Sequence, residues 1–272
     1  MTGCNGGVLD DSKVAGNHSY TGATVDLRQI SGAALSRIMH PPGQRIEPHR
    51  HDWPVLAIYR LGGYREEIDG AADVFDGPSV VFHPSGAEHA DEVGDVGLET
   101  VSLSFDPGWL DAETRAMLPD RSWSRAGGAA ALAARRLAAA WLQPRASDAE
   151  LRAATSHFFR EALVASLPRR PNWVDQLEAS LAAEEAKTAE LHPAWLARAY
   201  RAWRGEGLAE TARRRRVERA VTMLRSGAES LAAVAADAGF CDQSHMNRCF
   251  NAVLGRTPLE VRREARLLAA VS

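Results

Sequence analysis

Two patterns of apolar and polar residues divide the chain. Between about residues 24 and 105, apolar residues come in short runs such as Val55–Tyr59, Ser79–Phe82 and Leu98–Phe105, and glycine, proline or aspartate separates the runs. Short apolar runs between turn residues are typical of β-strands. This segment therefore predicts a small antiparallel sandwich or barrel.

From about Trp109 the pattern changes to alanine, leucine and arginine at helical spacing. Helices are expected at 129–141 and 149–167, and again after the tract 168–171, which is expected to be a linker because proline disfavours helix in the residue before it. The fold class is therefore α+β with two domains. The expected organisation, in order, is a flexible arm (1–22), an antiparallel β-barrel domain (23–108), a helical connector (109–170) and an all-α domain with two helix-turn-helix units (171–272).

The most informative stretch is residues 231–262. Ser230 and Asp242 are suited to cap two successive helices, and Gly239 suits the tight turn between them. In the second helix, apolar residues recur at three- and four-residue steps and predict one buried face. The residues left on its opposite face are Gln243, Ser244, Asn247, Arg248 and Asn251. These side chains carry the donors and acceptors that a helix in the DNA major groove needs.

This stretch resembles the signature of the AraC/XylS family of bacterial transcription regulators. The resemblance covers about the last third of the chain and rests on residue types at fixed spacing: Ala238-Gly239-Phe240, Asp242, Ser244, Arg248, Phe250, Gly255, Thr257-Pro258 and Arg262. It implies two recognition helices, joined by a long helix, that enter major grooves about 34 Å apart. The alternative is an amphipathic helical pair that packs only on its own protein.

The first unit of this domain is expected at residues 191–205. Leu196, Tyr200 and Trp203 fall on one helical face. The residues expected to face the groove are Ala194, Ala197, Arg198 and Arg201. The segment before this helix is shorter than the family pattern, with Glu190 where a turn glycine is usual. A scaffold helix with surface arginines is the alternative.

A central helix is expected at 208–224, and it contains four successive arginines at 213–216. Because they point around the helix, one or two are expected to reach DNA phosphate while the others are solvated.

In the N-terminal part, residues 48–51 (PHRH) and 77–89 resemble the two motifs of the cupin fold, which binds small effectors or mediates dimerisation in many members of the family. His49, His51 and His89 stand where metal-bearing cupins have ligands, but the carboxylate expected a few residues after His51 is missing. We therefore expect these histidines to line an effector pocket or to hydrogen-bond within the barrel, without a bound metal ion. The alternative is Zn²⁺ held by the three imidazoles with one open position. His83 is expected to face outward without a role.

Composition narrows the possible functions. Residues 171–272 carry a net charge of +2 and residues 1–170 carry −5, so phosphate attraction has to come from local clusters. No run of 18 apolar residues indicates a membrane span, and three scattered cysteines indicate no disulfide framework. Hydrolase, nucleotide-phosphate and dinucleotide motifs are absent from the sequence. We therefore expect no enzyme activity and no cofactor.

The sequence thus predicts a cytoplasmic, bacterial transcription regulator. Its expected partners are double-stranded DNA, a small-molecule effector in the barrel and a second copy of the chain, with RNA polymerase if it is an activator, and no membrane. Effector, operator and direction of regulation stay open. The alternatives are a metal-binding cupin (a sensor or an enzyme) whose helical tail dimerises, and an effector-independent regulator.

Overall fold

The computed structural model describes residues 23–68, 70–76, 78–164, 177, 193–227 and 229–269. The expected arm (1–22), the linker at 168–171 and, apart from residue 177, the segment between that linker and residue 193 lie outside the described residues.

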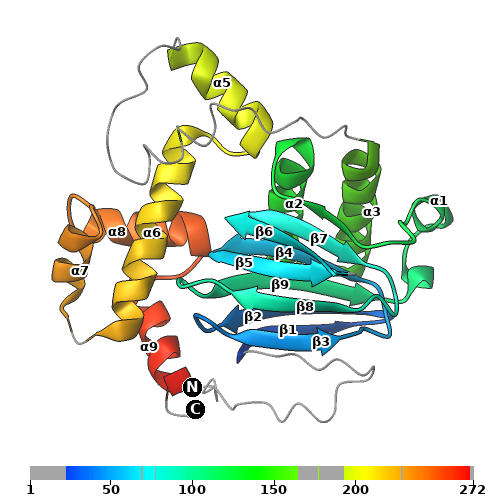
Figure 1. Cartoon of the computed structure of the whole chain (residues 1–272), viewed down its shortest axis with the longest axis horizontal. Coiled ribbons are helices and arrows are strands. Elements are labelled where there is room, and N and C mark those ends of the chain that lie inside the picture. The colour runs from blue at the N-terminus through cyan, green and yellow to red at the C-terminus, as the bar shows by residue number, and fades with distance from the viewer. Residues whose placement is uncertain are drawn as a thin grey trace.

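Antiparallel strands build the N-terminal part, as the short apolar runs predict. They are β1 (Ala23–Ile30), β2 (Ala33–His40), β3 (Arg45–His49), β4 (Val55–Leu61), β5 (Gly63–Ile68), β6 (Ala71–Asp76), β7 (Ser79–His83), β8 (His89–Val93), β9 (Leu98–Phe105) and β10 (Trp123–Arg125). A six-stranded sheet has the order β1-β2-β9-β4-β7-β10, and a four-stranded sheet has the order β3-β8-β5-β6. The two sheets are layered on one another (Figure 1).

The larger sheet has two different faces because side chains alternate along each strand. In β9, Leu98, Thr100 and Ser102 point toward a pocket, whereas Leu103 and Phe105 join the main hydrophobic core. That core also contains residues of α2 (Gly128–Trp141) and α3 (Asp148–Val164), which cover this face of the sheet (Figure 1). The expected connector thus supplies much of the N-terminal core; a short helix, α1 (Ala112–Ala116), follows the 3-10 turn at Pro107–Trp109.

One strand falls in the segment expected to be helical. Strand β10 pairs with β7, with Trp123 opposite Phe82. A strand of three residues is too short to show a period of two, so sequence alone did not reveal it.

The C-terminal part is helical. Its helices are α5 (Pro193–Arg204), α6 (Leu208–Ser226), α7 (Leu231–Asp237), α8 (Gln243–Leu254) and α9 (Pro258–Ala269). Helix α6 is the expected central helix, and it shares a second core with α7, α8 and α9 through residues such as Val217, Val221, Met246 and Phe250. None of the helices in the described part of the chain is long and apolar enough to cross a membrane.

The helical part lies against one end of the sheets (Figure 1). Leu61, at the end of β4, is fully buried in the core of the helical part. Arg60 donates to the carbonyl of Val253 (2.8 Å), and the amide of Gly62 donates to the Glu218 carboxylate (3.2 Å). One buried apolar side chain and two hydrogen bonds therefore join the N-terminal sheets to the helical part.

Candidate DNA interface and ligand pocket

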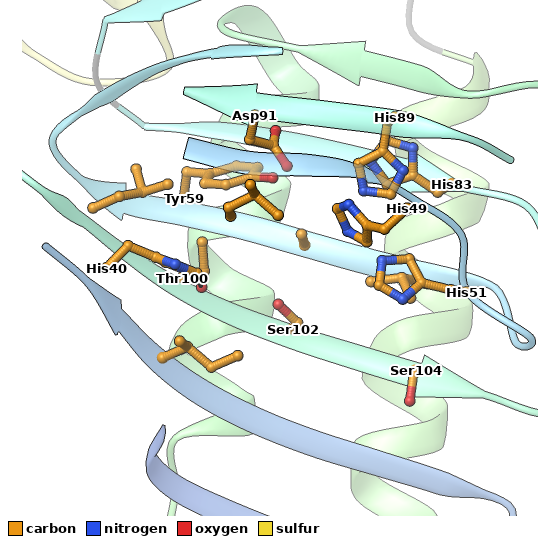
Figure 2. Close-up of a pocket in the computed structure, with 15 residues that line it drawn as sticks. His40, His49, His51, Tyr59, His83, His89, Asp91, Thr100, Ser102 and Ser104 are labelled. Atoms are coloured by element: carbon orange, nitrogen blue, oxygen red, sulfur yellow. Dashed lines mark hydrogen bonds between the residues drawn. The ribbon is translucent and has the colours of Figure 1, made fainter. Parts of the chain in front are cut away.

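A small pocket lies inside the N-terminal sheets. Its cavity volume is about 80 Å³, and its labelled lining residues come from both sheets (Figure 2). Thr100 and His40 lie at one end, where their side chains are 3.4 Å apart, and a group of histidines lies at the other end.

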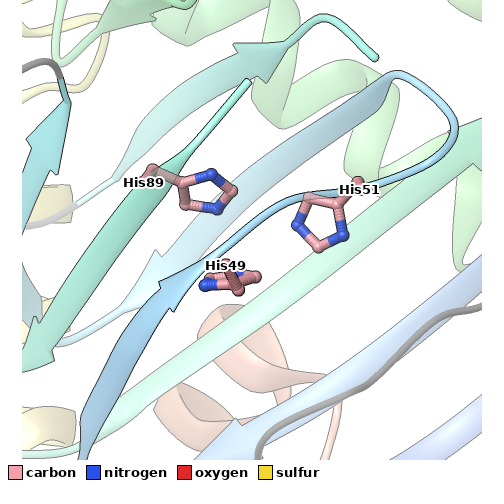
Figure 3. Close-up of side chains that lie close together, drawn as sticks. All are labelled: His49, His51 and His89. Carbon is pink, nitrogen blue, oxygen red and sulfur yellow. The ribbon is translucent and has the colours of Figure 1, made fainter. Parts of the chain in front are cut away.

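The three motif histidines converge at this second end. His49 and His51 flank the end of β3, and His89 begins β8 (Figure 3). One ring nitrogen from each lies within 4.8 Å of the others, and the rings are inclined to one another by 40–89°. The expectation that these residues share one site is met by the geometry.

Backbone hydrogen bonds set the orientation of two of these rings. The Nδ1 atom of His49 is 3.0 Å from the carbonyl oxygen of Glu47, and Nδ1 of His89 is 3.4 Å from the carbonyl oxygen of Ala87. A carbonyl only accepts, so these contacts favour the tautomer that carries the proton on Nδ1 and presents a lone pair on Nε2. This arrangement is typical of metal-binding histidines.

His83 does not face outward, and that expectation was wrong. It is 2% exposed and stacks on His89, with ring centroids 3.8 Å apart and nearly parallel planes. Its Nε2 is 3.0 Å from Oε1 of Glu66, which is 1% exposed. Glu66 was not predicted, because strand β5 contributes it and the motif places its carboxylate earlier, just after His51.

Burial favours the neutral form of most of these groups. It lowers the pKa of His83 to about 4 and, with the neighbouring histidines, that of His89 to about 2. Burial also raises the pKa of Glu66 to about 8, and Asp73 adds to the effect. A buried neutral imidazole is the form that binds metal ions.

The donor set fits a metal ion of the zinc type. Three nitrogen ligands with one open position form a recurrent site, and the cavity is large enough for an ion with bound water. The parallel rings of His83 and His89 cannot both direct a lone pair at one ion, so His83 is better placed to support His89 than to share the ion with it.

The candidate DNA interface is built on the α7–α8 turn. Ser230 accepts a hydrogen bond from the amide of Ala233 (3.1 Å), and Asp242 accepts one from the amide of His245 (2.6 Å). Gly239 and Gly255 have φ values of +83° and +68°. The predicted caps and glycine positions are therefore confirmed.

Helix α8 has one apolar and one polar face. Met246 and Phe250 are fully buried against α6, whereas Gln243, Ser244 and Arg248 are exposed and Asn247 is partly exposed. Most of the polar face is therefore open to solvent.

Comparison with known families identifies this region. Residues 186–264 match the family model described as a helix-turn-helix domain.

This part of the chain is an AraC-type helix-turn-helix domain.

Solved structures that match the chain cover different shares of it. ToxT from Vibrio cholerae is 11% identical over 85% of this chain and 97% of its own, with a TM-score of 0.39. Oxalate decarboxylase from Bacillus subtilis is 24% identical over 28% of this chain and 21% of its own (TM-score 0.26), and the Cnp3 cupin domain from Schizosaccharomyces pombe is 10% identical over 30% and 58% (TM-score 0.28). No curated protein matches the chain.

Within the AraC-type domain, α5 is the first candidate recognition helix. Leu196 and Tyr200 are buried as predicted, and the Tyr200 hydroxyl lies 3.1 Å from Thr211 Oγ1 on α6. The four residues predicted to face the groove are all exposed: Ala194, Ala197, Arg198 and Arg201. Arg201 also lies 3.6 Å from Glu210 at the start of α6.

The arginine run of the AraC-type domain is divided between interior and surface. Arg214 is 3% exposed in its side chain and pairs with Glu206 (3.1 Å) and Glu218 (2.7 Å). It cannot reach DNA in this arrangement, whereas Arg213 is exposed. The expectation that the arginines of the run that do not contact phosphate are solvated is therefore wrong for Arg214.

Proposed function

We propose that this protein is a transcription regulator that binds specific DNA sequences through both recognition helices and changes its DNA binding when a ligand occupies the N-terminal pocket. The observation that carries the proposal is the exposed polar face of α8, held on a capped and packed helical frame. Such a face suits the major groove, where base edges present hydrogen-bonding groups.

In this mechanism Gln243, Ser244, Asn247 and Arg248 contact base edges in one groove. An arginine can bind guanine O6 and N7 together, so Arg248 is the strongest candidate for reading a base. Ser244 and Gln243 lie in the first turn of α8, where a recognition helix commonly contacts bases.

Helix α5 provides the second contact. Arg198 and Arg201 bind phosphate or guanine, while Ala194 and Ala197 offer only van der Waals contact, for example to a thymine methyl group. Because α6 packs on both units, one chain presents the two helices as a single body, and a homodimer would present four.

The ligand we propose for the pocket is a divalent transition-metal ion. A cavity of about 80 Å³ is smaller than the roughly 300–1,000 Å³ of sites that hold drug-sized molecules. His49, His51 and His89 supply the ligands, and the ion supplies a positive charge that ties β3 to β8. The cupin-like arrangement of the two motifs supports this position.

The DNA-binding proposal is tested by selection from random duplexes. The purified chain is incubated with a random library at moderate salt and with excess nonspecific DNA, and the retained duplexes are sequenced. We expect two enriched half-sites about one helical turn apart. Enrichment of no motif by a folded protein would overturn the proposal.

A matched control identifies the surface. The double variant Gln243→Ala, Arg248→Ala should lose the half-site that α8 reads, and Arg198→Ala, Arg201→Ala should lose the other. Arg45→Ala, on an exposed strand of the smaller sheet, should leave both half-sites unchanged.

A second experiment tests the pocket. The affinity of EDTA-treated protein for the selected duplex is compared with that of protein loaded with Zn²⁺, and unchanged affinity would exclude the metal ion as effector.

A further inference from the structure

A second cavity lies on the opposite face of the larger sheet from the histidine pocket. Its volume is about 480 Å³, within the range of small-molecule sites, whereas the histidine pocket has about 80 Å³. Strands β1, β2 and β9 form one wall, and the end of α2 with the loop that follows forms the other.

The wall of this cavity combines buried apolar side chains with polar and charged ones, which include Asp26, Arg28 and Arg37. Leu35, Val101 and Trp141 are buried side chains of the lining, at 6%, 0% and 2% exposure. Arg28 also lines the cavity, but it is committed to the loop, because it donates to the carbonyl of Ala146 and lies 3.5 Å from Asp148. Arg28 therefore fastens the loop to β1, which keeps the cavity formed.

Arg37 is the basic group with unused donors. Its Nε donates to Glu99 (3.2 Å), its side chain is 14% exposed, and its Nη2 is buried without a hydrogen-bond partner among the described residues. A buried guanidinium nitrogen without an acceptor is unfavourable, and an anion is the complementary group.

The surroundings of Arg37 carry excess positive charge. Four arginines (Arg37, Arg60, Arg225 and Arg256) lie among three carboxylates: Glu99, Glu264 and Asp26, which stands opposite Arg37 on β1. The crowding is reflected in Arg60, whose pKa is lowered by burial and by Arg37 and Arg256 despite the attraction of Glu99. A ligand that brings a negative charge would relieve this imbalance.

We propose that the second cavity binds a small carboxylate-bearing molecule, with its carboxylate on the free guanidinium edge of Arg37 and its apolar body against Leu35, Val101 and Trp141. The site is separate from the pocket of the proposed function, and its ligand is of a different chemical class. The ligand carboxylate would contact Arg37, and Arg37 bonds Glu99. Arg256 of the helical part bonds the same Glu99 at 2.5 Å, so the ligand would be linked to the helical part through these side chains.

The test is calorimetric titration of the purified full chain, without DNA, with three acids of different shape and their uncharged amides: octanoate, phenylbutyrate and cyclohexanecarboxylate. We expect at least one acid to bind about tenfold or more tighter than its amide, since a charge-assisted hydrogen bond contributes roughly 1.5–3 kcal/mol. Arg37→Gln should remove the preference for the acid. Arg45→Gln, an exposed arginine on β3, should keep it.

A second variant tests the same cavity by its shape, so the test does not depend on correct folding of Arg37→Gln alone. Leu142→Trp places bulk at the partly exposed rim of the cavity without changing charge, and it should abolish binding of the acid and the amide alike. Three results would overturn the proposal: none of the acids binds, acid and amide bind equally, or binding survives in Arg37→Gln and Leu142→Trp. Loss of acid binding on His49→Ala instead would assign the ligand to the histidine pocket. Because DNA is absent, none of these results depends on the DNA-binding proposal.

Discussion

Arg256, which follows α8, donates to Glu99 of β9 at 2.5 Å, and Glu99 is completely buried. The same carboxylate accepts from Arg37 of β2 and Arg60 of β4, so one acidic group holds three strands of the larger sheet and the helical part together. Glu99 is also next in the chain to a residue of the histidine pocket. Thr100, the next residue of β9, lines that pocket from the other face of the strand.

This alternation recurs on the neighbouring strands. Arg37 precedes the pocket residue Ile38, and Arg60 follows the pocket residue Tyr59. Each arginine that bonds Glu99 from the sheet is therefore adjacent to a residue that lines the pocket. A ligand that shifts these strands has a short physical route to the helical part, which is what coupling between two sites requires.

Glu99→Gln should weaken this junction. Removing one member of a buried charged cluster leaves the others uncompensated, and we expect a loss of about 3 kcal/mol in the free energy of unfolding, measured in urea. Glu92→Gln, which removes an exposed pair with Arg45, should cost less than about 1 kcal/mol. Equal losses in the two variants would show that Glu99 does not hold the junction.

The effect of Glu99→Gln on the free energy of unfolding should depend on pH in a predictable direction. Burial alone would raise the pKa of Glu99, but Arg60, Arg256 and Arg37 hold it below its ordinary value of 4.5. A lowered folded-state pKa contributes stability that is present above the unfolded pKa and is lost as pH falls through the folded pKa. The difference between wild type and Glu99→Gln should thus be constant near neutral pH and shrink below about pH 4.

Two adjacent arginines should behave in opposite ways. Arg214→Ala leaves Glu206 and Glu218 buried without their partner, so we expect about 3–5 kcal/mol of destabilisation. Arg213→Ala, one residue earlier and exposed, should leave thermal unfolding nearly unchanged. If Arg213 contacts phosphate, its loss should reduce the slope of log affinity against log salt by about one. Similar melting temperatures for both variants would contradict the buried role of Arg214.

Local signals explain how much of the fold the sequence predicts. The caps Ser230 and Asp242 and the turn residues Gly239 and Gly255 act on their own neighbours, so each could be assigned without knowledge of the tertiary structure. The division of α8 into two faces follows from helical periodicity in the same way. This is why the candidate DNA interface was visible in the sequence.

The rest depends on register and on pairing between distant strands. In a strand buried on both faces, such as β7, periodicity does not indicate where His83 points, and a shift of one residue reverses it. Glu66 reaches His83 only because β5 belongs to the opposing sheet. Likewise, nothing in four identical arginines distinguishes Arg214 until Glu206 and Glu218 are placed beside it.

Gly255→Ala should destabilise the AraC-type domain through its backbone alone. The residue has a φ of +68°, and an added Cβ would meet no atom within 4 Å, so the cost is the roughly 1–2 kcal/mol of the left-handed conformation. Gly227→Ala is the matched control, because its φ is −141° and its new Cβ would make only ordinary contacts. Thermal unfolding monitored by circular dichroism compares them; an equal effect would refute the backbone explanation.

The histidine pocket should bind one Co²⁺ or Zn²⁺ ion per chain, since three nitrogen donors converge there. Cobalt reports the site directly, because a four-coordinate ion absorbs visible light much more strongly, and at longer wavelength, than an aqueous ion. His89→Ala should abolish this absorption, whereas His157→Ala, at an exposed position on α3, should retain it. Cobalt spectra that are the same in His89→Ala and wild type would place the ion elsewhere.

Arg248→Ala should weaken binding to the selected duplex without affecting folding. The side chain is exposed on α8, so its removal leaves the core formed by Met246 and Phe250 intact. If Arg248 reads a guanine, affinity should fall by about 1–3 kcal/mol, and replacement of that guanine in the duplex should cost the wild type the same amount and the variant almost nothing. A loss of affinity that is uniform across sequences would instead assign Arg248 to phosphate. Unchanged affinity in the folded variant would remove Arg248 from the interface, and gel-shift titration of both proteins on both duplexes separates the three results.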